Sequence, residues 1–279
     1  MATTSTALAK PLIDDEVAAM GSPAWRAPVL RWWHWGVIIS VSIIGPFSTD
    51  SYIPSLPTMT RELATSTVWA GLTLQLNWVS KGVGNIILGR VSDATGRRPM
   101  IVAAFCIYCV ATLGCSFAPT ISWLLAARVL QGLGEASNPI CMAIARDAID
   151  EPARRMRMLA VLSLIRPLAI VIAPAIGGLI GAEFGWRVVF RCLTAWGLLN
   201  LLLSVGLLPE TLPPKPPPAP ADGSMPPLPP GLGQQCHRLL CRRLSLGLLL
   251  TQALTFSAPM SMLSSISFVL EEEHGASTE

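Results

Sequence analysis

The segment GRVSDATGRRP, at residues 89–99, decides the fold of this chain. It places glycines, one acid and two consecutive arginines in a short polar stretch between two long apolar runs, at 68–88 and 100–117. Turns of this composition join two membrane helices on the charged side of a bilayer. The pattern therefore predicts a pair of helices with a tight polar loop, in which Gly89 ends the first helix.

The composition of the whole chain indicates a bilayer environment. Of 279 residues, 52% are hydrophobic and 13% are charged, which excludes a water-soluble globular domain of this size. A membrane-spanning helix needs roughly 20 apolar residues, and its backbone amides must be paired within the segment. The sequence predicts an all-α polytopic membrane protein with seven apolar runs, at 33–53, 68–88, 100–117, 121–145, 158–181, 188–208 and 244–269.

Lysine and arginine are unevenly distributed between the two sides of the predicted helices. They are frequent before the first run and after the second, fourth and sixth, whereas the other loops hold only Arg61, Arg187 and Arg191. Because positively charged loops stay in the cytoplasm, we expect a cytoplasmic N-terminus. Seven helices then place the C-terminus outside. This orientation argues against a receptor of the G-protein-coupled type, whose N-terminus is outside.

Composition also divides the chain into segments. We expect a disordered cytoplasmic N-terminus at 1–31, a six-helix bundle at 32–208, a proline-rich cytoplasmic linker at 209–243, a seventh transmembrane helix at 244–270 and a tail at 271–279. The cysteines fall mostly inside apolar runs and are interpreted as packing residues. We therefore predict no metal site.

Two of the predicted helices carry a stripe of polar residues along one face. The polar residues recur every four positions in the second run and every three or four in the fourth, so each set stays on one side of its helix. A polar stripe in a membrane helix faces water or protein rather than lipid. Together with the fifth run, the stripes supply the expected cavity-lining residues, Thr73, Asn77, Lys81, Gln131, Asn138 and Arg166.

Charged residues within the apolar runs form two layers when depth is counted at about 1.5 Å per residue. Asp50 and Arg128 share one layer and could meet there. Glu135 shares the other with Lys81 and Arg166, and we expect it to pair with one of them, because an unpaired charge near the bilayer centre is costly. An extended Lys81 side chain that reaches the cytoplasmic headgroups is the equally weighted alternative.

The polar segment resembles the signature loop between the second and third helices of the major facilitator superfamily of transporters. That loop has glycine, aspartate and arginine at the positions that correspond here to Gly89, Asp93, Gly96, Arg97 and Arg98. Ala94 departs from the pattern, since the family usually has a basic residue in its place.

Further motifs resemble those of drug:proton antiporters in the superfamily, particularly the bicyclomycin and chloramphenicol resistance type. The first run ends in STDSYIPSLPTM, at 48–59, where the prolines stop the helix, and the fourth contains ARVLQG, at 127–132. The fifth contains the antiporter motif, represented by Ala173, Pro174, Gly177 and Gly178. The resemblance implies the major facilitator fold and a multi-pass protein of the cytoplasmic or plasma membrane.

The resemblance further implies export of small amphipathic compounds in exchange for protons, by alternating access, and no enzymatic activity. We expect Asp50 to take up and release the proton, with Arg128 as the cation that tunes it. Glu135 is the alternative proton carrier, and a static ion pair is the alternative for either carboxylate. The expected partners are the lipid bilayer, a small-molecule substrate and protons. No cofactor and no nucleic acid are expected.

The length corresponds to the N-terminal half of a twelve-helix transporter plus its seventh helix. A non-transporting remnant or interaction subunit is therefore the rival hypothesis, and a homodimer that rebuilds both halves is a third. In complete family members the signature aspartate helps to latch the two halves together. Here we expect Asp93 to pair locally, with Arg97 or with Arg146 and Arg154.

Overall fold

The computed structural model describes residues 28–212, together with residues 247 and 251, and every regular element in this part of the chain is helical. In chain order the elements are α2 (Trp32–Asp50), the 3-10 helix η1 (Ile53–Ser55), α3 (Leu56–Glu62), α4 (Thr67–Thr95), α5 (Arg97–Ser116), α6 (Ile121–Gly134), α7 (Asn138–Asp147), α8 (Pro152–Phe184) and α9 (Trp186–Leu207). This confirms the all-α fold class. Nearly all of the expected linker at 209–243, the seventh helix at 244–270 and the tail lie outside the described residues, as does most of segment 1–31.

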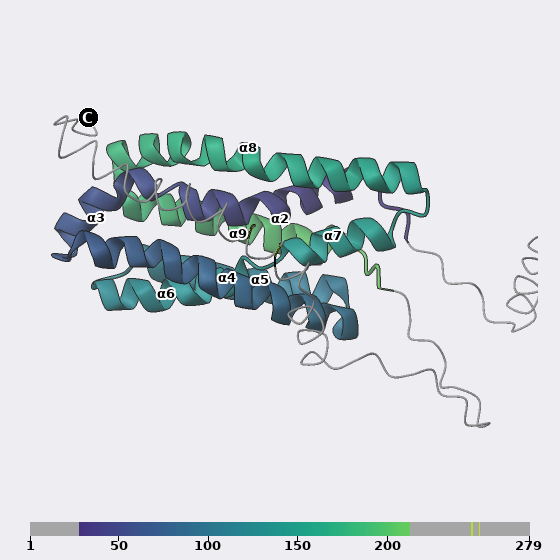
Figure 1. The fold of residues 1–279 in the computed structure, drawn as a ribbon, viewed down its shortest axis with the longest axis horizontal. Helices are drawn as coiled ribbons and strands as arrows, with labels where there is room; N and C mark the ends of the chain where they lie inside the picture. Colours follow the sequence, from purple (N-terminus) through teal and green to yellow (C-terminus); the bar gives the residue numbers. More distant parts are fainter. Residues whose placement is uncertain (1–27, 213–246, 248–250, 252–279) are drawn as a thin grey trace, which may run out of the picture.

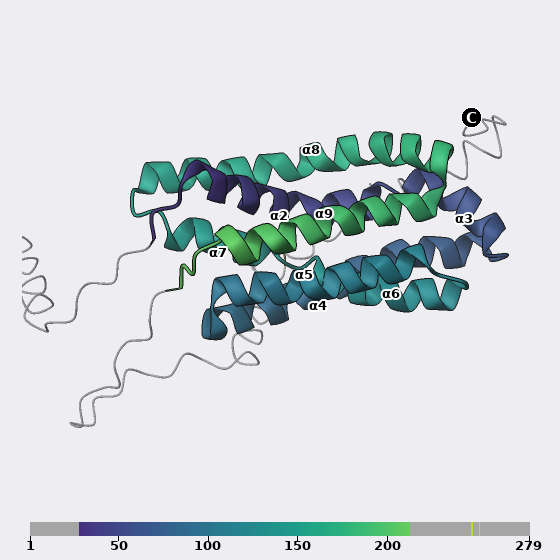
Figure 2. The same cartoon turned by 180° about the vertical axis from the view of Figure 1, so that it is seen from behind.

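The long helices lie side by side in one bundle (Figure 1). In both views α8 runs along one edge, α2 and α9 lie next to it, and α4, α5 and α6 form the opposite edge (Figure 2). The most extensive packing joins α5 to α9 and α6, α4 to α6, and α2 to α8. The six expected membrane helices correspond to α2 with α3, to α4, to α5, to α6 with α7, to α8 and to α9.

The apolar core of the described residues forms two clusters at different heights of the bundle. In the first apolar run, the first cluster ends at Ile44 on α2, and the second begins at Tyr52, two residues after the end of α2. The buried residues between them on α2 are small or polar, and Asp50 is one of them. The candidate site therefore lies in a polar layer between two apolar layers.

The first helix ends before Pro54 and Pro57, as predicted, but the chain beyond it is helical again. Helix α2 ends at Asp50, because Pro54 has no N–H to donate to the carbonyl four residues earlier, but the chain remains helical through η1 and α3 as far as Glu62. Pro54 lies in η1, and Pro57 lies in the first turn of α3, where the missing N–H costs little.

The fourth run is two helices rather than the single helix predicted for 121–145. Helix α6 ends at Gly134, and α7 begins at Asn138. Pro139 explains the break, because it cannot donate to the carbonyl of Glu135 and its ring would clash with that carbonyl in a continuous helix. The break places Glu135 immediately after the end of α6.

The polar segment at 89–99 is mostly helix, so the prediction of a loop that begins at Gly89 is wrong. Gly89 lies inside α4, and the turn between α4 and α5 is the single residue Gly96. Its φ of 116° is in the region that favours glycine over residues with a side chain. A single glycine therefore reverses the chain direction here.

Four segments of the described chain are long and apolar enough to cross a membrane: Trp32–Glu62, Arg97–Ser116, Pro152–Phe184 and Trp186–Leu207. Two of the six expected spans do not meet this test. Helix α4 has 29 residues and is long enough, so its polar stripe explains why it is not apolar enough. In the fourth run, the break leaves α6 with 14 residues and α7 with 10, each too short alone.

Candidate functional site

Asp50 is a buried carboxyl at the C-terminal end of α2. Its exposed fraction is 0%, and neither of its side-chain oxygens has a hydrogen-bond partner among the described residues. Lys81, Glu135 and Arg128 are close enough to act electrostatically on its charge. A buried carboxylate without hydrogen bonds is strongly disfavoured, whereas the protonated acid is tolerated far better. The position therefore suits a group that binds a proton.

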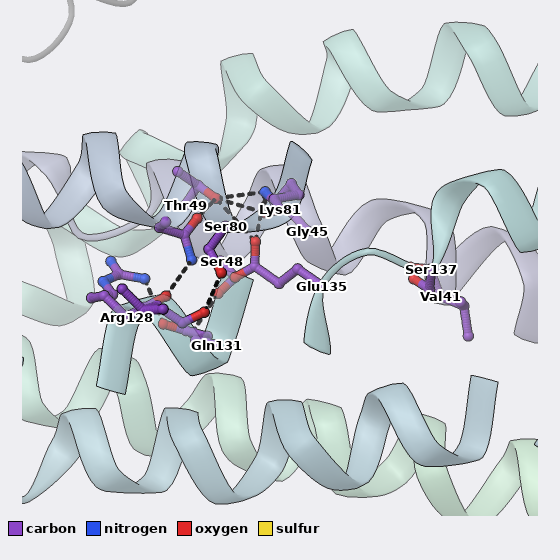
Figure 3. A network of polar contacts seen from close by, with 12 residues as sticks. Val41, Gly45, Ser48, Thr49, Ser80, Lys81, Arg128, Gln131, Glu135 and Ser137 are labelled. Atoms are coloured by element: carbon purple, nitrogen blue, oxygen red, sulfur yellow. Dashed lines mark hydrogen bonds and ion pairs between the residues drawn. The ribbon is translucent and has the colours of Figure 1, made fainter. Parts of the chain in front are cut away.

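Glu135 is the second buried carboxyl, at the break between α6 and α7. Its Oε2 lies 2.6 Å from the Nζ of Lys81 on α4, and the Glu135 side chain is completely buried (Figure 3). This confirms the pairing with Lys81 that depth counting allowed. No ion pair joins Glu135 to Arg166 in the described part of the chain, and Lys81 points into the bundle rather than toward headgroups.

The ammonium group of Lys81 has a full set of acceptors. Besides Glu135, it donates to the hydroxyl of Thr49 at 2.9 Å and to the carbonyl of Gly45 at 3.2 Å (Figure 3). An ammonium has three N–H donors, so this set uses all of them. The ring of Trp78 lies 4.5 Å below the same Nζ and adds a cation–π contact. These contacts offset part of the cost of burying the Lys81 charge.

Thr49 and Asn77 link the ion pair to the neighbouring helices. The Thr49 Oγ1 lies 3.0 Å from the carbonyl oxygen of Gly45, 3.1 Å from Oδ1 of Asn77 and 3.3 Å from Oε2 of Glu135, so its single proton can go to any one of three acceptors. The Asn77 amide donates to the backbone carbonyl of Arg128 at 3.3 Å. One connected network therefore joins α2, α4 and α6.

Arg128 makes no hydrogen bond or ion pair with Asp50, a contact that their shared depth allowed, although its charge acts on Asp50 electrostatically. Its Nη1 donates to Gln131 at 2.6 Å, and Gln131 donates in turn to Ser48 at 2.8 Å. The guanidinium stacks on the ring of Tyr52, with 3.7 Å between its central carbon and the ring centroid. Its Nε and Nη2 have no hydrogen-bond partner in the described residues.

The remaining predicted cavity residues have different environments. Thr73 is buried, and its hydroxyl lies 3.0 Å from that of Tyr52. Asn138, at the start of α7, and Arg166, within α8, are only partly buried. Asn138 Oδ1 and Arg166 Nε are enclosed without a hydrogen-bond partner among the described residues. Their assignment as cavity residues stays a prediction.

The signature segment forms an ionic cluster around Arg97. Arg97 pairs with Asp93, as expected, and also with Asp147 at the end of α7, with 3.2 Å between Nε and Oδ2. Its Nη1 donates to Ser92 at 2.8 Å. The cluster therefore joins α4, α5 and α7 at one end of the bundle.

Glu210, which follows α9, is a residue that the sequence interpretation missed. It accepts the backbone N–H groups of Arg97 at 2.9 Å and Arg98 at 3.1 Å, at the positive N-terminus of α5. A Cβ on Gly96 would lie 2.6 Å from Glu210 Oε2, so the glycine also admits this carboxylate. The acid that follows the sixth run, in LLPET at 207–211, could have indicated this contact.

The antiporter motif on α8 packs against the chain immediately after Asp50. A Cβ on Gly177 would lie 1.7 Å from the carbonyl oxygen of Ser51, whereas one on Gly178 would lie 3.5 Å from Pro54. Ala173 is fully buried on the same helix. Gly177 therefore permits a direct backbone contact between α8 and the end of α2.

Comparisons with known proteins decide the family. The model of the Major Facilitator Superfamily matches residues 38–279. The chain belongs to this superfamily. Its membership confirms what the signature segment predicted and makes the chain a polytopic membrane protein of a transporter family.

Two relatives illustrate the relationship. The chain is 31% identical over 175 residues to the multidrug resistance protein MdtL of Escherichia coli O9:H4 (strain HS). It is 34% identical over 178 residues to YdgK of Bacillus subtilis (strain 168), an uncharacterised MFS-type transporter. Each match covers 62% of this chain and 44% of the relative, so the matched region spans less than half of each relative's length.

A solved structure supports the same fold. A bacterial homologue of the human lysosomal transporter Spinster, in an inward-facing and unoccupied conformation, superposes with a TM-score of 0.68. The match covers 89% of this chain and 58% of the other, at 20% sequence identity. At this identity the likeness shows the fold alone.

Among the residues that the structure describes, no cluster of histidine, cysteine and acidic side chains could hold a metal ion.

Proposed function

We propose that this chain acts in proton-coupled export of small amphipathic compounds by alternating access, with Asp50 as the proton carrier. The observation that carries the proposal is the burial of the Asp50 carboxyl with no hydrogen bond to either oxygen. The likeness to a multidrug resistance protein supports the export of foreign compounds. The proton coupling and the substrate class are both part of the proposal.

The protonation state of Asp50 is the driving element of the proposed mechanism. With the proton bound, a neutral carboxyl is compatible with the closely packed layer between the two apolar clusters. When the proton leaves, a buried anion favours an arrangement that admits water or brings a cation closer. Arg128 is the cation available on α6, because its Nε and Nη2 are not used in hydrogen bonds to the described residues.

Helix α8 is the element that could transmit this change. The backbone contact between Gly177 and Ser51 lies one residue from Asp50, so a shift at the end of α2 must displace α8 or open the contact. Two prolines inside α8, Pro167 and Pro174, leave backbone carbonyls without their helical partners and make bending easier. We assign the antiporter motif a role in conformational change on this basis.

An apolar groove beside the same contact supports a lipophilic substrate. It has a volume of about 160 Å³ and lies between α2, α8 and α9, where Phe47, Ile176, Leu193 and Trp196 line it. A lipophilic group of a small compound fits such a surface.

The orientation in the membrane is proposed from the distribution of positive charge. Arg90, Arg97 and Arg98 lie at the same end of the bundle as the signature turn at Gly96. Because basic residues favour the cytoplasmic side, we place this end and the N-terminus in the cytoplasm.

The test is coupled transport by the purified 279-residue chain in liposomes with an acidic lumen. Ethidium and chloramphenicol serve as probe substrates, and a pH-sensitive dye reports proton efflux. We expect each probe to enter as protons leave, and Asp50→Asn to reduce coupled uptake at least about tenfold, as expected for loss of a proton-transfer group. Ser163→Ala on the exposed side of α8 is the matched control and should transport normally.

The same experiment decides between the proposal and its alternatives. Unchanged proton-driven uptake by Asp50→Asn would exclude Asp50 as the carrier. Absence of uptake by the wild-type chain, with a monomeric mass in detergent, would favour a non-transporting remnant or interaction subunit. Uptake by a dimer would favour self-association that rebuilds a two-half pathway.

A further inference from the structure

Lys81 and Glu135 form a buried charge pair whose role the proposed function leaves open. We propose that Lys81 is a built-in counter-cation that keeps Glu135 ionised, so that the site exchanges one proton, at Asp50, rather than two. The inference rests on the proposed role of this site in proton coupling. It assigns to Lys81 the control of how many protons the site binds.

The geometry of the ammonium group is the first argument. A cation that merely passed near Glu135 would leave some donors unused, but Lys81 donates to Glu135, Thr49 and Gly45 at 2.6, 2.9 and 3.2 Å. The acceptors come from the α6–α7 break and from α2, while Lys81 itself is on α4. The ammonium is therefore held by several elements at once. It supplies the positive charge that a bound proton would otherwise supply to Glu135.

The groups that face Glu135 are the second argument. Charged or titratable side chains that interact with it electrostatically come from α2, the start of η1, α4 and α5: Asp50, Tyr52, Lys81, Tyr108 and Cys115. Arg166, on α8, interacts instead with Cys141. Within the described residues, Lys81 is the cation that contacts the Glu135 carboxylate. Loss of this one ammonium would leave the buried carboxylate without a cationic partner.

Asp50 supplies an internal comparison for the argument. Both carboxyls belong to residues at the end of a helix and four positions before a proline, and both are buried. Of the two, only Glu135 contacts a lysine. If Lys81 is what distinguishes them, its removal should make Glu135 behave like Asp50 and bind a proton.

The experiment counts protonated carboxyls without requiring transport. The full chain in liposomes is titrated from mildly alkaline to mildly acid pH while infrared spectroscopy records the C=O band of protonated carboxylic acids. All variants carry Asp50→Asn, so that Asp50 does not contribute. The contribution of Glu135 is the difference between each protein and the same protein with Glu135→Gln added.

We expect no Glu135 band when Lys81 is present and a clear band, equivalent to one carboxyl per chain, in Lys81→Met. Lys81→Arg retains the charge and should remain without the band, which keeps the test decisive if Lys81→Met does not fold. A Glu135 band of full size with Lys81 or arginine in place would overturn the inference. So would a folded Lys81→Met protein without the band.

The outcome for the proposed function is independent. It is judged from the band that Asp50→Asn removes from the otherwise wild-type protein. If that band is absent, Asp50 does not bind a proton in this range and the proposed function fails, whereas the inference about Lys81 is still decided by Glu135.

Discussion

Asp50 and Glu135 occupy equivalent local structures but differ in the groups that contact them. Asp50 is the last residue of α2 and precedes Pro54 by four positions, and Glu135 follows α6 and precedes Pro139 by four. In each case the proline withholds the N–H that would bond the acidic residue's carbonyl, so the helix ends there. The difference is that Glu135 contacts Lys81, whereas the Asp50 carboxyl has no hydrogen-bond partner among the described residues.

The comparison separates what the backbone decides from what the neighbours decide. A carboxylate at the C-terminal end of a helix is disfavoured by the negative end of the helix dipole, and burial increases the cost. Lys81 offsets this cost for Glu135. No such contact offsets it for Asp50. A helix end before a proline therefore holds a static ion pair at Glu135 and, we propose, a proton-binding group at Asp50.

The largest expected effect comes from removing the lysine. Lys81→Met should lower the free energy of unfolding by about 3–5 kcal/mol at neutral pH, because it leaves a buried carboxylate uncompensated. The loss should be smaller at acid pH, where a proton can take the place of the ammonium. Unfolding of the purified protein in mixed detergent and SDS measures both values.

A double variant checks the cause of that loss. Lys81→Met with Glu135→Gln removes both charges and should recover most of the stability. If the double variant is as unstable as Lys81→Met alone, packing around the lysine stem rather than the charge pair is responsible, and the comparison with Asp50 fails.

A glycine substitution disturbs the surroundings of Asp50 without touching the ion pair. Gly177→Ala forces a Cβ to within 1.7 Å of the Ser51 carbonyl oxygen unless α8 moves, so we expect a loss of about 1–3 kcal/mol in the same unfolding assay. Gly178→Ala is the matched control, because its Cβ would make ordinary contact with Pro54 at 3.5 Å. Equal losses for the two variants would contradict the close contact at Gly177.

A smaller effect is expected from Thr49→Val, which removes one acceptor of Lys81 while nearly preserving shape. The variant loses the hydrogen bond from Lys81 and the one that the hydroxyl donates, so we expect about 1.5–3 kcal/mol in total, because Lys81 keeps two acceptors. The infrared titration should still show no protonated Glu135. A protonated Glu135 in this variant would mean that Thr49, and not Lys81 alone, keeps the carboxylate charged.

The smallest effect on stability should come from Asp50→Asn. No hydrogen bond to a described residue is lost, so we expect a change of less than about 1 kcal/mol in the unfolding assay. Glu135→Gln, which breaks the ion pair, should cost several times more. Similar losses of stability for the two substitutions would show that the ion pair does not distinguish Glu135 from Asp50.

Depth counting along the sequence could place Lys81 and Glu135 in one layer, because the rise of a helix is nearly constant. It also allowed Asp50 and Arg128 to meet, but they make no hydrogen bond, because height does not determine the direction in which a side chain points. The guanidinium turns instead to Gln131 and the ring of Tyr52. Contacts of this kind depend on how helices rotate about their axes, which one sequence does not contain.

The helix breaks were only partly recognised, although the sequence contains their cause. Pro54 was interpreted as a stop, and α2 does end four residues before it, but the chain resumes its helical course. The equivalent role of Pro139 was missed, and so was the position of Glu135 at a helix end. The signature glycine, aspartate and arginines identified the family correctly, even though all of them except Gly96 lie in helices.

Proton release on substrate addition tests the central claim, that the two buried carboxyls have different roles, most directly. The purified chain is mixed with excess ethidium in weakly buffered detergent solution, and an indicator dye reports the protons released per chain. The account predicts about one proton from the wild-type protein and none from Asp50→Asn, since only Asp50 exchanges a proton. Two protons from the wild type, or one still released by Asp50→Asn, would contradict it.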